Sequence, residues 1–512
     1  MTALLRRVGC ALCAVILLFV VSCSESASNG QTTTSSSVDH GDNKEYVLTL
    51  PYCAKDVLNP YTAQTKQNQE LSHLLYDPLV KASQTFEPVF FLAENITQEG
   101  KTLTVTLRSA SFTDGAPITS DDVVYSLTQA RGDGSLYAAK LHNIDRVYAL
   151  DSKTVVVEIK HTDPRFTVNL DCPIIRMGTA DLKDANRLPL PPVGCGRYTL
   201  KNDGDVYSLV SNPSYYRGTV GLTEIRLSDC PDDDALNHQL SIGLINMVYS
   251  DLSRASVPKM AGATTPTVST SLVYLGANGR SRLTGDSRVR QAVSFALNRD
   301  ALCQDAFFGY AQPATGLFHP DWAPVEQLES IGTQPNDQLT VAYLEELGYN
   351  RLDDRGYRIN ASGERLKLQL LFNEENTARS TAADRIKTQL KRFGIDVKVQ
   401  SVPFEEYRRR LQNGQFDLYL GEVRLPNSMD VYSLFNEPDI VYGIPSDSQA
   451  RAAFNAYYAG ESDLLNAVSA FVSEMPFLPL CYRNGVILSS ETVKQMLSYS
   501  PSDLFNGIEQ LQ

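Results

Sequence analysis

The sequence carries none of the short patterns that usually mark a catalytic centre. It has no Gly-x-Ser-x-Gly and no His-Glu-x-x-His motif. The Gly-Lys-Thr run at Gly100–Thr102 lacks the upstream glycine of a phosphate-binding loop, because position 95 is Asn. Six histidines are scattered without the spacing of metal ligands. We therefore expect no enzymatic activity, no cofactor and no dedicated metal site.

The one reactive group with a clear chemical context is the thiol of Cys23. Arg6 and Arg7 precede an apolar run at 8–21, which is typical of a secretory signal and too short to remain as a membrane span. The run ends in Val-Val-Ser-Cys, which resembles the bacterial lipobox, in which the cysteine is lipidated. The sequence thus predicts a signal peptide at 1–22 and lipidation of Cys23. Residues 23–44, rich in Ser and Thr, are then expected to form a flexible tether.

The composition predicts a large folded protein that does not bind nucleic acid. The chain has 512 residues, of which 43 % are hydrophobic and 21 % charged, enough for more than one core. Lys plus Arg number 46 against 59 Asp plus Glu, a net charge of −13. A nucleic-acid partner is not expected, because such a surface repels phosphate backbones.

Six cysteines in the body leave two interpretations open. Export permits disulfides, and Cys172 with Cys195 is one candidate pair, whereas small buried thiols explain the same residues. The six are Cys53, Cys172, Cys195, Cys230, Cys303 and Cys481.

Hydrophobic periodicity predicts the elements that must position any site. Residues 45–51, 101–108 and 154–159 alternate apolar and polar side chains, as half-buried strands do. Apolar side chains then follow at helical spacing behind potential caps at 286–287. Between residues 386 and 420 the pattern indicates helix, strand, helix and strand, which predicts a βαβ-type unit.

Several longer stretches together resemble the oligopeptide- and dipeptide-binding proteins of ABC importers, the large three-domain class of solute receptors. In LRSASFTDGAPITSDDVVYSL (107–127), a strand leads through an Asp114–Gly115 turn to a helix that Thr119 and Asp122 can cap. Further matches are EPVFFLAE (87–94), SNPSYYRG (211–218), GYAQPATG (309–316) and FGIDVKVQSVPFEEYRRRLQNGQFDLYL (393–420).

This resemblance implies an α/β fold of two lobes joined by a hinge, with mixed β-sheets and a ligand held between the lobes. Lobe I would comprise residues 45–75, 186–270 and 480–512. A small domain II at 76–185 would pack on lobe I, and lobe II would span 271–479. Such a receptor works as a monomer, captures a peptide, closes and is recognised by the permease subunits of its importer.

The resemblance also implies the residues near the ligand. In peptide-binding relatives, the strand after a Phe-Asp pair carries a tryptophan and then an aspartate that binds the peptide amine. Here Glu422 stands near the first position and Arg424 or Leu425 near the second. Glu422 or Asp430 is therefore expected to bind the amine, or Arg424 a carboxylate. The other expected ligand-binding residues are Gly421 and Val423, which offer backbone pairing, Asn427 in the same segment, and Tyr52, Lys55 and Tyr482 at ligand-near family positions.

The missing aspartate leaves the ligand class open. A peptide is the first expectation, and a nickel chelate, haem or a sugar is the alternative for the same receptor. A surface adhesin or chaperone that uses the same clamp is a third class. Ser24 is not the aspartate that retains lipoproteins at a Gram-negative inner membrane, so the outer face of a single-membrane cell is the preferred location. The periplasm of a cell with two membranes is the alternative.

Overall fold

The computed structural model describes residues 48–204, 206–252, 262–494 and 499–508. They form a mixed α/β fold with several separate β-sheets, as the sequence predicts. Cys23 and the expected signal peptide and tether lie outside these residues, so they remain predictions.

The first sheet has the strand order β1-β10-β9-β8. β1 pairs in parallel with β10, and the other neighbours are antiparallel. Helix α1 packs on β1, β8 and β11. The elements are β1 (Thr49–Tyr52), α1 (Lys66–Leu75), β8 (Tyr198–Asp203), β9 (Val206–Ser211), β10 (Glu224–Asp229) and α3 (Asp233–Ser241).

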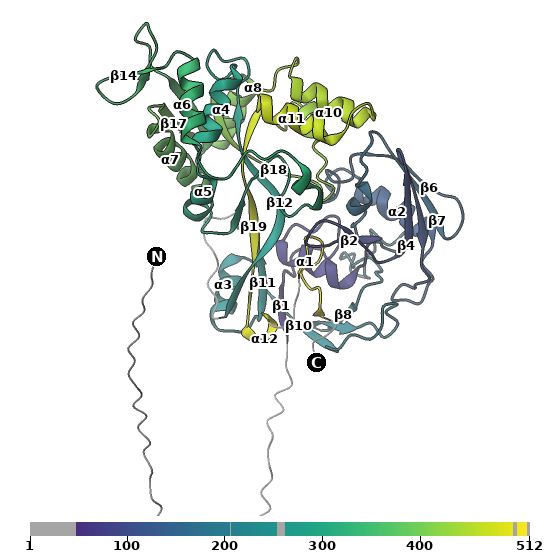
Figure 1. Ribbon diagram of the computed structural model, residues 1–512. Coiled ribbons are helices and arrows are strands. Elements are labelled where there is room, and N and C mark those ends of the chain that lie inside the picture. Colours follow the sequence, from purple (N-terminus) through teal and green to yellow (C-terminus); the bar gives the residue numbers. More distant parts are fainter. Residues whose placement is uncertain (1–47, 205, 253–261, 495–498, 509–512) are drawn as a thin grey trace, which may run out of the picture. The chain divides into compact units, whose positions relative to one another are not determined.

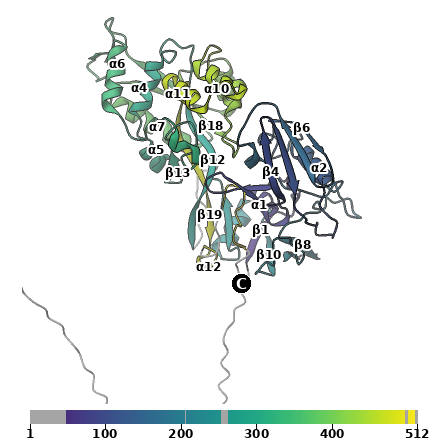
Figure 2. The same ribbon diagram turned by 45° about the vertical axis from the view of Figure 1, so that its right-hand side comes forward.

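The second sheet is fully antiparallel, and α2 lies beside it (Figure 2). It confirms the strands expected at 101–108 and 154–159. The Asp122 carboxylate accepts a 2.9 Å hydrogen bond from the Thr119 N–H, and Gly115 has φ 86°, so the predicted helix cap and turn are both present. In sheet order the strands are β4 (Ala93–Glu99), β5 (Thr102–Leu107), β7 (Thr154–Ile159) and β6 (Ile144–Ala149), with α2 at Ser120–Ala130.

The third sheet contains the predicted βαβ-type unit. β16 runs parallel to both β17 and β18, with α7 and α8 as the intervening helices. The strand order is β11 (Met247–Ser250), β19 (Phe477–Ser489), β12 (Ala263–Ala277), β18 (Leu418–Arg424), β16 (Lys367–Asn373) and β17 (Asp396–Val402). β13 (Ala311–Pro313) pairs with β19 outside that path, α7 spans Thr377–Lys391 and α8 spans Phe404–Gln412.

The helical run expected from residue 286 divides into two helices. Asp286 caps α4 (Ser287–Ala296), as predicted, but Leu297 is extended and Asn298 caps a second helix, α5 (Arg299–Ala306), by accepting from the Ala301 N–H at 2.8 Å. The remaining elements are α6 (Asp337–Glu346), α9 (Tyr432–Asn436), α10 (Gln449–Ala459), α11 (Leu464–Glu474), α12 (Glu491–Lys494), 3₁₀ turns at Phe166–Asn169 and Ala323–Gln327, and short strands β2 (Val80–Ala82), β3 (Pro88–Phe90), β14 (Arg351–Leu352) and β15 (Arg358–Ile359).

The two longest strands, β12 and β19, run antiparallel side by side (Figure 1). Their register shifts twice, between Thr267 and Ser271 and between Val273 and Tyr274. At the first shift, β12 advances from Thr267 to Ser271 while the partner in β19 changes only from Gly485 to Arg483. The extra residues of β12 form a bulge-like segment that leaves the ladder.

Two large hydrophobic clusters form separate cores. The first core joins the first and second sheets and contains Leu50, Val105 and Leu227. The second core surrounds the third sheet and contains Leu275 and Leu370. All six body cysteines are buried and unpaired, which agrees with the interpretation as buried thiols.

A buried ionic cluster fastens the C-terminal segment at 500–508 to the first core. Lys81 Nζ lies 2.7 Å from Asp503 Oδ2, and Arg197 Nη2 contacts both Asp503 oxygens at 3.0 Å. Arg197 also donates to the Phe505 carbonyl at 3.0 Å. Burial alone would raise the pKa of Asp503, but Arg197 and Lys81 hold it well below its usual value.

Replacing Asp503 should therefore destabilise the protein. Asp503→Ala removes the carboxylate that Lys81 and Arg197 share and leaves Lys81 paired with only Asp77 among the described residues, at 3.4 Å. We expect the free energy of unfolding to fall by about 3–5 kcal/mol. Because the folded pKa is depressed, this contribution is present above pH ~4 and is lost as the pH falls further. Chemical denaturation between pH 3 and 7 measures both effects. Asp305→Ala, which removes an exposed pair with Arg385, is the control and should cost about 1 kcal/mol or less. Equal losses would contradict the assignment.

Candidate functional site

A cavity of about 410 Å³ lies between residues of the two cores. One wall comes from α1, residues 136–142 and Asp171. The facing wall comes from residues 423–427 at the end of β18, and the offset segment of β12 at 267–270 runs between the walls. Residues 500–504 complete the lining. The volume lies within the range of roughly 300–1,000 Å³ that is typical of small-molecule sites.

Arg424 presents a cation to this cavity from the end of β18. Its backbone pairs with Ser271 of β12. The next residue, Leu425, donates its N–H to the Thr270 carbonyl at 3.0 Å and accepts from Thr270 Oγ1 at 2.6 Å, which anchors the end of the strand. The exposed guanidinium of Arg424 makes no side-chain hydrogen bond or ion pair with any residue that the structure describes. It is therefore available to bind a carboxylate.

Glu70 of α1 is an acid on the facing wall. Its side chain is 17 % exposed, and burial raises the pKa of the carboxyl to about 7, although Lys66 and Arg424 act in the opposite direction. His73 Nε2 lies 3.7 Å from Glu70 Oε2. Burial lowers the pKa of His73 to about 4, so this imidazole is neutral near pH 7. Glu70 consequently lacks a close, fully charged partner.

The other cavity charges are largely neutralised by one another. Lys140 Nζ lies 2.6 Å from Asp171 Oδ1. The second oxygen of Asp171 accepts from Asn427 Nδ2 at 2.8 Å and from Ser502 Oγ at 2.6 Å. Through these contacts, Asp171 links the segment after β18 to the C-terminal segment at the edge of the cavity.

The structure divides the predicted residues of the β18 segment into two groups. Val423, Arg424 and Asn427 line the cavity. Glu422 does not, because its carboxylate is paired with Arg483 at 2.7 Å and with Arg379 at 3.7 Å. Gly421 also lies outside the lining; a Cβ there would meet the ring of Tyr274 at 2.5 Å. β16 pairs with β18 only at Leu418 and Tyr419, so the outer edge of 421–424 has no strand neighbour among the described residues.

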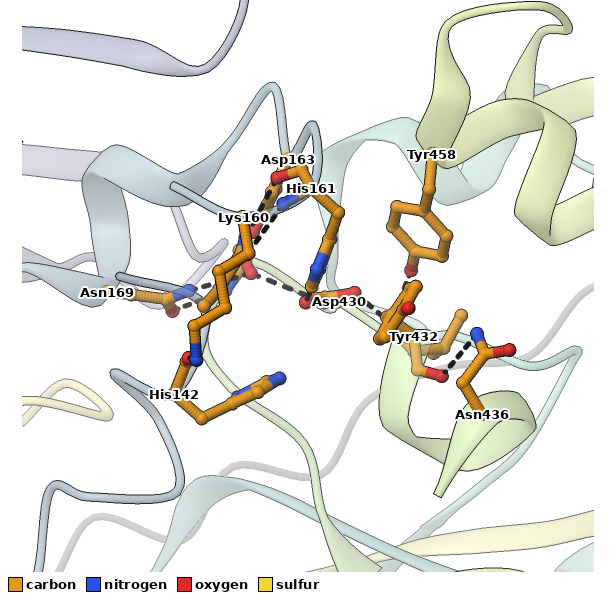
Figure 3. A network of polar contacts seen from close by, with 12 residues as sticks. His142, Lys160, His161, Asp163, Asn169, Asp430, Tyr432, Asn436 and Tyr458 are labelled. Carbon is orange, nitrogen blue, oxygen red and sulfur yellow. Dashed lines mark hydrogen bonds and ion pairs between the residues drawn. The ribbon is translucent and has the colours of Figure 1, made fainter. Parts of the chain in front are cut away.

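Asp430 joins two distant chain segments and does not line the cavity (Figure 3). Its Oδ2 lies 2.8 Å from His161 Nε2. Burial would raise the pKa of Asp430, but the hydrogen bond and charge of His161 hold it below its usual value. The His161 ring stacks on Tyr432 at 4.0 Å between centroids. Beside them, Asn169 donates to Ser428 Oγ at 2.9 Å and accepts the Ser428 N–H at 3.0 Å.

The three remaining predicted residues lie elsewhere. Tyr52 and Lys55 line a different cavity of about 710 Å³, where the Tyr52 ring meets Tyr207 at 5.3 Å between centroids. Tyr482 is fully buried and donates its hydroxyl to the Leu317 carbonyl at 2.6 Å. The structure therefore does not bring these three together with Arg424.

Sequence reasoning missed the side of the cavity opposite β18. Glu70, His73, Lys140 and Asp171 line it, but none of them is among the predicted ligand-binding residues. No helix is predicted around Glu70, and nothing in the sequence distinguishes it from a solvent-exposed acid.

Comparison with known proteins identifies the family. The family model described as bacterial extracellular solute-binding proteins, family 5 Middle, matches residues 86–437. The chain therefore belongs to the family 5 extracellular solute-binding proteins, which are substrate-binding proteins of ABC importers. Because the family consists of receptors, membership confirms that the chain is not an enzyme. No helix in the described ranges has the length and apolar character needed to cross a bilayer.

The relatives differ in what they are named for. The chain is 24 % identical to the oligopeptide-binding protein AppA of Bacillus subtilis, over 84 % of this chain and 82 % of that protein. It is 23 % identical to the nickel-binding periplasmic protein of Escherichia coli, over 87 % and 90 % respectively. The structure of a nickel ABC transporter from Bacillus halodurans aligns with a TM-score of 0.72 at 20 % identity, covering 90 % of this chain and 98 % of that chain. This likeness confirms the expected fold.

The contact around Asp430 leads to a stability prediction. Asp430→Ala removes the buried partner of His161, and we expect the free energy of unfolding to fall by about 3 kcal/mol. Amide hydrogen exchange should also rise in residues 160–169 and 427–436. The exposed Asp439→Ala, on the same part of the chain, should change the free energy of unfolding by no more than about 0.5 kcal/mol and should leave the exchange of both segments unchanged. Unchanged exchange in both segments would show that the contact contributes nothing.

Proposed function

We propose that the chain captures a short peptide in the cavity lined by Arg424 and delivers it to the permease of its importer. The observation that carries this proposal is an exposed guanidinium that has no partner among the described residues and lines a cavity between two cores. In the proposed architecture, residues 45–75, 186–270 and 480–512 with domain II at 76–185 form one side, and residues 271–479 form the other. The separate clusters support this division.

Backbone geometry supports a peptide. The outer edge of residues 421–424 has no strand neighbour among the described residues, and an extended peptide can pair with such an edge. Arg424 would bind the peptide's carboxylate through two parallel hydrogen bonds. Backbone pairing gives affinity that depends little on side-chain sequence. The name of the Bacillus subtilis relative favours the same ligand class.

A metal chelate is the second candidate. His73 and His142 line the cavity, and a neutral imidazole can coordinate a metal that arrives bound to a carboxylate chelator. The Escherichia coli relative, named for nickel binding, points in the same direction. The described residues contain no group of three or more His, Cys, Asp or Glu side chains arranged to hold a metal ion, so a chelator would have to supply most of the ligands.

The proposed location is the outer face of the cell membrane. Lipidation of Cys23 would anchor the body through the tether at 23–44 and keep it beside the permease. Mass spectrometry of the N-terminal peptide from the mature protein would detect a diacylglyceryl or triacyl group on Cys23 if the proposal is correct.

Arg424→Ala tests the cavity directly. Removing the cation should weaken ligand binding at least tenfold, while the free energy of unfolding changes by no more than about 0.5 kcal/mol because none of the described residues pairs with this side chain. Arg408→Ala is the matched control, since Arg408 is 51 % exposed on α8 and outside the cavity. Affinity should be measured by calorimetry on peptides recovered from the native protein. A loss of stability with unchanged affinity would contradict a ligand role.

The ligand itself can be recovered. The full chain, expressed in its host and purified without denaturation, should release a series of short peptide masses when it is denatured in the mass spectrometer. A control sample dialysed against denaturant before refolding should release none. A single non-peptide mass, or a mass with the isotope pattern of nickel, would transfer the function to the chelate candidate.

A further inference from the structure

We propose that Glu70 binds the ammonium group of the ligand while Arg424 binds its carboxylate, so that the receptor selects short peptides with both ends free. This inference rests on the proposed peptide function and adds the residue that replaces the missing aspartate of the peptide-binding relatives. It also places the two anchors on different sides of the cavity, because Glu70 belongs to α1 and Arg424 to β18.

The surroundings of Glu70 explain why a cation is the expected partner. The side chain is mostly buried in the cavity wall, and a partly desolvated carboxylate needs compensation. His73 at 3.7 Å is neutral near pH 7, and Lys66 lies 3.7 Å from a different acid, Asp251. A primary ammonium brings three donors and a full charge to a carboxylate that has no Lys or Arg within 4.0 Å among the described residues.

The relation between Glu70 and Arg424 limits the length of the ligand. The charge of Arg424 lowers the pKa of Glu70, so the two groups interact across the cavity, yet no ion pair within 4.0 Å joins them among the described residues. An extended peptide adds at most about 3.6 Å per residue. We expect two or three residues between the anchors, because a cavity of about 410 Å³ leaves little room for a longer extended chain.

The other acids of the cavity are less suited to this role. Asp171 is already paired with Lys140 and accepts hydrogen bonds from Asn427 and Ser502. Glu437 lines the cavity but is exposed, where water solvates a carboxylate and a new ion pair gains little. Glu70 is the cavity acid that gains most from a ligand cation.

Capture should displace the proton that Glu70 holds below about pH 7. Among the described residues, the groups that interact with Glu70 are Lys66, His73, Tyr137, Tyr249, Asp251, Arg424 and Asp503. Lys140, His142, Asp171 and Glu437 line the same cavity. The pKa values of His73 and Asp503 are lowered, and those of Tyr137 and Tyr249 are raised. The protonation states of these four groups therefore do not change between pH 5.5 and 7. A peptide amine, with a pKa near 8, also stays charged there. Affinity should therefore fall by about tenfold per pH unit below pH 7.

The test uses three pools of random tripeptides: one with both ends free, one N-acetylated and one C-amidated. The full chain is mixed with each pool at pH 7, and retained masses are measured by native mass spectrometry. We expect the free pool to be retained at least tenfold more than either blocked pool. Glu70→Gln should lose this preference for a free amine and the dependence on pH, while still discriminating against the amide.

Glu405→Gln is the matched control, because Glu405 is 85 % exposed on α8 and lies outside the cavity, and it should behave as the wild type. Equal retention of the acetylated and free pools by the wild type would overturn the role of Glu70 and leave peptide capture intact. A loss of amine preference in Glu405→Gln but not in Glu70→Gln would overturn it as well. If the wild type retains no pool, the proposed function fails and the inference fails with it.

Discussion

The cavity depends on the burial of one carboxylate, Asp503, between two cations. Lys81 and Arg197 come from elements of the first core, and a group that is 2 % exposed must be neutralised where it lies. The geometry of this cluster therefore determines where residues 500–508 run. Ser502, next to Asp503, reaches Asp171 and Asn427 on the cavity wall. An electrostatic requirement at the end of the chain thus organises a site built from its beginning and middle.

Polar contacts between the two sides of the cavity follow one rule. Groups that meet across the junction, such as His161 with Asp430 and Asn169 with Ser428, satisfy one another. Arg424 and Glu70 are different, because each faces the cavity and neither has a fully charged partner within ion-pair distance among the described residues. A site that binds a charged ligand needs such groups, because side chains that are already paired with one another cannot form new ion pairs with the ligand.

Local signals predicted the fold well, and long-range electrostatics limited prediction of the site. The cap at Thr119 and Asp122 and the strand at β18 depend on neighbours a few residues away, so periodicity and turn chemistry were sufficient. Glu422 and Asp430 were expected to meet the ligand, but their partners Arg483 and His161 are 61 and 269 residues distant in sequence. No local pattern reveals that these carboxylates are already engaged. Conversely, the partial burial of Glu70 becomes visible only once α1 packs beneath the cavity.

The pairing of β12 with β19 has a consequence for how such receptors diversify. Gly276 and Phe477 are register partners, so the whole intervening stretch leaves and rejoins the fold at neighbouring points. That stretch carries Val423, Arg424 and Asn427, whereas Glu70, His73 and Lys140 lie outside it. A genetic exchange with breakpoints in these two strands would replace one half of the specificity surface as a single cassette. New ligand preferences can then arise by recombination, with the N-terminal half of the site inherited unchanged.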